Sequence, residues 1–155
     1  MKIEFINPFI RAINKAMVTM TNISPDRGDP YRKVGRSTNG DITGIIGFAE
    51  ERISGSVILS FPANTIARIY EKMTGEKVEE LNSEVDDIVG ELTNIVVGGA
   101  KKEFAEKGYS YNISLPMVVS GRNHVIMHKH ENPMIVIPLS FDHNDFFMEV
   151  SLKIS

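Results

Sequence analysis

Residues 83–107 read SEVDDIVGELTNIVVGGAKKEFAEK, and this stretch decides the fold of the chain. Apolar residues recur three and four positions apart, which predicts an amphipathic helix with one face on a hydrophobic core. Asn82 or Ser83 is a suitable N-cap, and Gly108 predicts the end of the helix near Lys107. The residues expected to face the core are Val85, Ile88, Val89, Leu92, Ile95 and Val96.

The opposite face of this helix carries Asp87, Glu91, Asn94 and Gly98. At about 100° per residue, these four positions fall within an arc of about 60°. The glycines of the helix are Gly90, Gly98 and Gly99. Asn favours a helix poorly, and each Gly costs up to about 1 kcal/mol relative to Ala. Residues that lower helix propensity this much on an exposed face predict that the face is a contact surface.

The composition is that of an ordinary globular protein. The chain has 155 residues, of which 42% are apolar and 24% charged, and this predicts a single domain over residues 1–155. A net charge of −3 argues against nucleic acid and anionic membranes as partners. Cysteine is absent, which excludes disulfides and thiolate chemistry and fits a cytoplasmic location. Neither a signal peptide nor a phosphate-binding glycine loop is visible.

An N-terminal helix is predicted from the apolar spacing between Phe5 and Met20. Asn7 followed by Pro8 is typical of an N-cap and the first helical position, so we expect the helix to start there. Glu4 lies three residues before Asn7, which repeats the Glu-x2-Asn spacing of the later helix. A structural role for this pair is favoured, and a second functional site remains the alternative.

The middle of the chain predicts a hairpin followed by a short helix. Thr43–Ala49 and Ile53–Phe61 are rich in apolar and β-branched residues, and the polar residues 50–52 between them suit a turn. Asn64–Thr74 has helical spacing and is expected to stop at Gly75.

The rest of the chain is expected to be strands, over Tyr111–Val119, His124–His130, Met134–Phe141 and Phe146–Ile154. The last one alternates, with Glu149, Ser151 and Lys153 on its polar face, which predicts a half-buried antiparallel strand. Helix followed by strands occurs over 1–60 and again over 83–155, which suggests an internal duplication. Segregated helices and strands joined by short turns favour an α+β layered fold.

The spacing Asp87-x3-Glu91-x2-Asn94-x3-Gly98 resembles the signature helix of the CheC/CheX/FliY phosphatases of bacterial chemotaxis. The similarity extends to GIIGFAEERISGSVILSFP at 44–62, DDIVGELTNIVVGGAKKE at 86–103 and LPMVVSGRN at 115–123. The length, the single clear motif and the strand-rich tail are most similar to the CheX members. The resemblance implies a CheC-like layered fold, with two long helices on a mainly antiparallel sheet, and a homodimer.

The resemblance also implies an activity. Family members hydrolyse the aspartyl-phosphate of the response regulator CheY. Glu91 would then pair with the active-site lysine of the regulator, and Asn94 would orient the attacking water, both as catalytic residues. Asp87 and Gly98 would contact the partner. The regulator would supply Mg²⁺, so neither a metal nor a cofactor of this chain's own is expected.

The residue types suit this chemistry. An in-line displacement at phosphorus gains mostly from positioning, and a carboxamide can both donate and accept hydrogen bonds without repelling phosphoryl oxygens. A rival interpretation is a non-catalytic adaptor that binds a receiver domain or a flagellar component through the same helix face. Binding and turnover would use the same residues, so the sequence leaves both open.

His124, His128 and His130 share one face of a predicted strand, which raises a metal- or solute-sensing domain as a second rival. No carboxylate is placed with them on that strand face, so a solvated strand face is the favoured interpretation. His143 lies in the polar turn DHND and gives no signal of its own.

Overall fold

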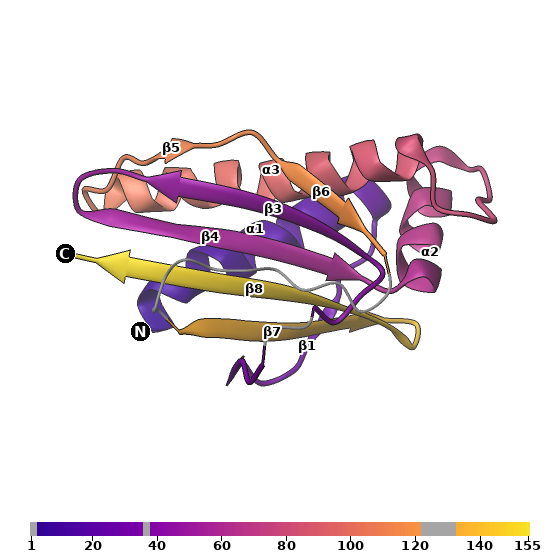
Figure 1. Ribbon diagram of the computed structural model, residues 1–155, viewed down its shortest axis with the longest axis horizontal. Helices are drawn as coiled ribbons and strands as arrows, with labels where there is room; N and C mark the ends of the chain where they lie inside the picture. The colour runs from indigo at the N-terminus through magenta and orange to yellow at the C-terminus, as the bar shows by residue number, and fades with distance from the viewer. Residues whose placement is uncertain (1–2, 36–37, 122–132) are drawn as a thin grey trace.

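The computed structural model describes residues 3–35, 38–121 and 133–155 as three helices and one sheet of eight strands (Figure 1). The helices are α1 (Ile3–Thr21), α2 (Ala63–Thr74) and α3 (Ser83–Glu106). The longer strands are β3 (Ile42–Ala49), β4 (Ile53–Phe61), β7 (Met134–Phe141) and β8 (Asn144–Ile154). The short strands are β1 (Asp26–Arg27), β2 (Tyr31–Arg32), β5 (Asn112–Ile113) and β6 (Met117–Ser120).

The sheet is antiparallel at every pairing and symmetric in its connections. Its order is β1-β7-β8-β4-β3-β5, with β2 also on β7 and β6 also on β3. The short strands β1 and β2, which follow α1, therefore pair with β7 of the C-terminal half of the chain. The short strands β5 and β6, which follow α3, pair with β3 of the N-terminal half. β4 and β8 meet at the centre. This exchange is what an internal duplication of helix and strands predicts, in an α+β layered fold.

The helices lie on one face of the sheet, with α2 at one end (Figure 1). The core between the layers contains an aromatic cluster that joins α1, α3, β3 and the start of the β5 segment. Phe9 of α1 lies 5.6 Å from Phe48 and 5.4 Å from Phe104, ring centre to ring centre. Tyr111 packs on Phe48 at 4.6 Å, and its hydroxyl donates to the Val97 carbonyl at 2.8 Å. This cluster fixes the chain between α3 and β5 on the helix layer.

Several local predictions are confirmed. β3 and β4 form the expected hairpin, and α2 ends at Gly75 with φ of +79°, where glycine avoids steric strain. The DHND turn joins β7 to β8 through Asp142 and His143, both with positive φ. Two such residues are typical of the tight turn whose twist matches a hairpin.

The predicted start of the first helix is wrong. α1 already includes Ile3, so Asn7 is inside the helix and is not its N-cap, and Pro8 is an interior residue. A proline there removes one backbone hydrogen bond near the helix start. Pro8 and Phe9 are buried against the core, and this packing offsets the loss.

The predicted strand Tyr111–Val119 is interrupted. β5 and β6 are separate, and Leu115 and Pro116 lie between them. Proline has no backbone N–H to donate to a neighbouring strand, so the ladder breaks at this point.

The predicted solvated face of β8 is also wrong in part. Glu149 and Ser151 are buried, at 0% and 3% exposure, and Lys153 is exposed as expected. Lys33, just after β2, places its ammonium group 2.6 Å from the Glu149 carboxylate, and that lysine side chain is only 8% exposed. A buried carboxylate requires such a partner, and residue spacing along β8 does not reveal it.

The strand expected over His124–His130, with its three histidines, lies outside the described residues. Elsewhere, no group of three acidic or histidine side chains is arranged to hold a metal ion. None of the three helices described is both long and apolar enough to cross a membrane.

Candidate functional site

Local sequence fixes both ends of α3. The Asn82 side chain accepts hydrogen bonds from the backbone N–H groups of Glu84 and Val85, both at 3.0 Å. Such an N-cap satisfies donors that the first turn would otherwise leave without partners. At the other end, Gly108 follows the helix with φ of +89°. The predicted cap and the predicted stop are both confirmed.

The apolar stripe of α3 is buried with one exception. The buried members of the predicted set are Val85, Ile88, Val89, Leu92 and Val96. Ile95 is 37% exposed, so the prediction that it faces the core is wrong. At about 100° per residue, Ile95 lies only about 40° around the helix from Glu91. It therefore falls at the edge of the exposed face.

Close packing on β3 decides which way α3 is turned. A Cβ at Gly44 would come within 2.2 Å of Thr93 Oγ1 and 3.2 Å of the Val89 carbonyl oxygen. Thr93 is itself buried, and its hydroxyl donates to the Val89 carbonyl at 2.7 Å. The helix thus rests directly on the strand backbone along this side. Asn94, the next residue, turns outward as a result.

The structure brings the four predicted polar-face positions onto one outward side of α3. Asp87, Glu91 and Asn94 are exposed, and within the described ranges none of them has a hydrogen bond or ion-pair partner. A Cβ added at Gly98 would meet nothing within 4 Å. The space above Gly98 is therefore open to another molecule.

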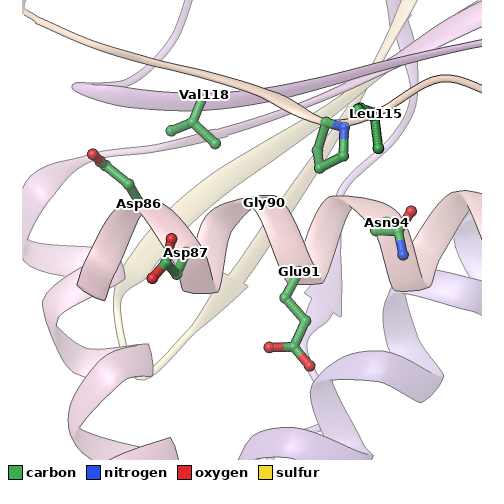
Figure 2. A pocket seen from close by; sticks show the side chains of 8 residues that line it. Asp86, Asp87, Gly90, Glu91, Asn94, Leu115 and Val118 are labelled. Atoms are coloured by element: carbon green, nitrogen blue, oxygen red, sulfur yellow. The ribbon is translucent and has the colours of Figure 1, made fainter. Parts of the chain in front are cut away.

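An open groove of about 590 Å³ runs along one side of this face, between α3 and the β5–β6 segment (Figure 2). Its lining residues are Asp86, Asp87, Gly90, Glu91, Asn94, Leu115, Pro116 and Val118. The two walls lie close together at Gly90, where an added Cβ would be in van der Waals contact with Val118 at 3.5 Å. Figure 2 shows the Asp86 side chain on the same side of α3 as Val118, whereas Glu91 extends to the opposite side of the helix.

Four of these residues, Asp86, Leu115, Pro116 and Val118, are not among those that the sequence singled out. The last three come from a segment distant in sequence, and the antiparallel pairing of β6 with β3 brings it beside α3. The proline within a predicted strand was the one local sign that this segment is irregular. Asp86 resembled any other first-turn carboxylate, and the structure gives it a contact with Ser120 Oγ at 3.4 Å.

A second groove, of about 560 Å³, lies on the other side of Asn94, between α1 and α3. Asn94 lines both grooves. The exposed face of α3 from Asp87 to Gly98 thus forms a ridge, and the Asn94 carboxamide lies on this ridge between the two grooves. Arg11 of α1 binds Glu103 of α3 across this second groove, with hydrogen bonds of 2.5–3.1 Å. These hydrogen bonds hold the pKa of the Glu103 carboxyl below its usual value.

The Glu-x2-Asn spacing of α1 does not reproduce the site of α3. Asn7 is half-buried, and the position corresponding to Gly98 is occupied by Arg11, whose side chain is bound to Glu103. A bulky residue there fills the space that Gly98 leaves open on α3. The structural interpretation of Glu4 and Asn7 is therefore favoured over a second site, although their predicted capping role is wrong.

The side chains at this site are suited to positioning a partner and a water molecule. The exposed polar groups of the Asp87–Gly98 face are carboxylates and one carboxamide, and the exposed Lys15 and Lys102 line the α1–α3 groove on the other side of Asn94. Asp86, Asp87 and Glu91 would repel an unaccompanied phosphate ester, since all three are acidic. From the side of these carboxylates, the approach of a phosphoryl group to Asn94 is favoured when a cation carried with that group neutralises its charge.

Comparisons with known proteins agree with this geometry. A sequence model of the family described as chemotaxis phosphatase CheX matches residues 42–140, which is more than half of the chain. The chain belongs to the CheX family. Members of this family are phosphatases and therefore hydrolases, as the resemblance had implied.

Relatives of the CheX family match along nearly the whole chain. The CheY-P phosphatase CheX of Thermotoga maritima is 26% identical over 155 residues, covering 99% of this chain and 98% of the relative. The crystal structure of a CheC-like superfamily protein from Shewanella sp. PV-4 has a TM-score of 0.92 at 38% identity, covering 99% of each chain. The CheX-CheY-BeF3-Mg²⁺ complex of Borrelia burgdorferi includes a chain of the same fold, with a TM-score of 0.81 at 23% identity, covering 98% of this chain and 99% of that one.

Gly44→Ala should destabilise the protein by disturbing the packing of α3 on β3, and so disturb the site that α3 carries. The added methyl group must displace Thr93 or the α3 backbone, so the free energy of unfolding should fall by about 1–3 kcal/mol. Urea denaturation of the variant measures this loss. Adding Thr93→Ala removes the closest atom, and the double variant should regain stability relative to Gly44→Ala. Equal stability of Gly44→Ala and wild type would contradict the proposed helix–strand contact.

Proposed function

We propose that residues 1–155 act as one phosphatase domain that hydrolyses the aspartyl-phosphate of a CheY-type response regulator. The observation that carries the proposal is the Asn94 carboxamide, which is exposed, has no partner within the described residues and stands between two grooves. The Thermotoga maritima relative is named a CheY-P phosphatase, which supports the same substrate here.

Asn94 would act on water. Its carboxamide oxygen would accept a hydrogen bond from the water, and its N–H group would donate to a phosphoryl oxygen. The water oxygen would bond to phosphorus while the bond from phosphorus to the aspartyl oxygen breaks. The products are a free carboxylate on the regulator and inorganic phosphate, and the proton from the water leaves with phosphate or solvent. Positioning of this kind is the main contribution a protein makes to phosphoryl transfer.

Glu91 would hold the partner in place. It lies nearly one turn before Asn94 on the same exposed side, so a cation bound at Glu91 stands beside the reacting group. A lysine in the active site of the regulator would be such a cation. Asp87 and Gly98 would extend the contact in both directions along α3, Gly98 by letting the partner backbone approach closely.

Mg²⁺ would arrive with the regulator. The three carboxylates around Asn94 disfavour a bare phosphoryl anion, so the substrate needs a cation of its own. The Borrelia burgdorferi structure is a complex of CheX with CheY, BeF3 and Mg²⁺, which supports this source of the metal. A metal bound within the regulator would neutralise the phosphoryl oxygens before they meet this acidic face.

Asn94→Ala should slow hydrolysis about 10²–10³-fold, because one well-placed polar contact at a transition state contributes about that much. Glu91→Ala should instead raise KM more than it lowers kcat. Both are measured by the decay of phosphorylated regulator in the presence of Mg²⁺. Matched controls are Asn64→Ala on α2 and Glu106→Ala at the far end of α3, both exposed.

Equal decay rates with wild type and Asn94→Ala would remove the catalytic role. If wild type binds the phosphorylated regulator tightly but leaves its decay rate unchanged, the chain is an adaptor and not a phosphatase.

Gly98→Ala should separate stability from function. The new methyl group meets open space within this chain and improves helix propensity by up to about 1 kcal/mol, so the melting temperature should not fall. It would also occupy the space into which the partner backbone is proposed to come, so KM should rise. A more stable variant with unchanged KM would exclude Gly98 from the contact surface.

We further propose a cytoplasmic homodimer joined through sheet edges. The outermost strands of the described sheet, β1, β2, β5 and β6, are two to four residues long, and their outward backbone edges offer a route for pairing between two copies. Light scattering at micromolar concentration should give twice the monomer mass. A monomer mass alone would contradict this assembly.

A further inference from the structure

Two large apolar side chains are exposed on the flanks of Asn94. Leu115 is 90% exposed and lines the groove between α3 and the β5–β6 segment. Ile95 is 37% exposed and lines the groove between α1 and α3. Single exposed hydrophobic residues are common, but two that flank the same polar group form a pattern that solvation does not explain.

The backbone holds Leu115 firmly in this position. Ser114 donates its N–H to the Gly47 carbonyl at 2.9 Å, and its hydroxyl accepts from the Gly47 N–H at 3.0 Å. On the other side, Met117 pairs with Ile45 of β3. The proline between them restricts the backbone further. A leucine on a backbone fixed in this way contacts a partner with little loss of backbone conformational entropy.

Figure 2 shows Leu115 on the wall opposite α3, near the turn of the helix that carries Asn94. Ile95 follows Asn94 directly in sequence and faces α1. The carboxamide is therefore bordered by an apolar side chain on each side. Contact of both side chains with another surface would remove water from around it, and polar interactions strengthen when water is excluded.

We propose that Leu115 and Ile95 form an apolar docking collar for the receiver domain of the response regulator, on the surface around its phosphorylated aspartate. This inference rests on the proposed function and adds residues that determine recognition. Charge favours this occupant over a second copy of the chain. In a symmetric dimer whose two-fold axis runs along this row, Asp86, Asp87 and Glu91 would face the same three carboxylates of the second copy. A receiver domain instead brings a lysine and Mg²⁺ to them.

The test uses Leu115→Ser and Ile95→Ser in the full chain, with a CheY-type receiver domain activated by beryllofluoride and Mg²⁺ as the binding probe. Each substitution should raise the dissociation constant and KM about tenfold, equivalent to about 1.4 kcal/mol, and leave kcat within about twofold. Leu115→Met keeps the apolar contact and should restore binding.

The matched controls are Val34→Ser, at 95% exposure near the opposite edge of the sheet, and Ile154→Ser, at 36% exposure at the end of β8. Neither should change binding or turnover. Far-ultraviolet circular dichroism and melting temperature confirm that all variants fold.

Binding of Leu115→Ser and Ile95→Ser within about twofold of wild type would overturn the collar. So would a change in oligomeric mass in these variants without a change in receiver binding, because the occupant would then be a second copy. If wild type binds the receiver without hydrolysing its phosphate, the proposed function fails, and the dissociation constants still decide the collar. A wild type that does not bind any CheY-type receiver overturns both.

Discussion

Helix α3 packs so closely on β3 that position 44 of the strand has no room for a side chain, and this position is a glycine. Thr93 and Val89 occupy the space above Gly44, and this fixes the rotation of α3 about its own axis. This contact therefore also sets the direction in which the residues of the exposed face, from Asp87 to Gly98, point. A rotation by one residue, about 100°, would turn Asn94 out of the exposed ridge. The polar face is thus positioned by packing on the buried side of the same helix.

The exchange of short strands between the two halves of the sheet adds the second element of the site. The segment after α3 crosses to β3, so Leu115 and Val118 form a wall beside the helix that precedes them in the chain. Tyr111 and the aromatic cluster anchor the start of that segment on α3. A groove on each side of Asn94 follows from this arrangement and from the crossing of α1.

The site has a carboxamide and several carboxylates, but among the described residues it has neither a metal-binding cluster nor a bound counter-charge. Its acidic character disfavours free phosphate esters and favours a partner that carries cations together with the phosphoryl group. Under the proposed function, the specificity of this phosphatase arises from complementarity between its surface and that of the regulator. The CheX family membership of the chain agrees with this physical description.

The amino-acid sequence by itself determined the helix of residues 83–107, its cap at Asn82, the β3–β4 hairpin and the polar row from Asp87 to Gly98, because local spacing and capping chemistry encode these features. Only the tertiary structure decided which side chains from distant segments join that row. Leu115 reaches the site through strand pairing, and Lys33 neutralises the buried Glu149 across β7. Asn7 loses its capping role because the helix begins before it. These outcomes depend on packing between elements far apart in the chain, and periodicity along one segment contains no information about them.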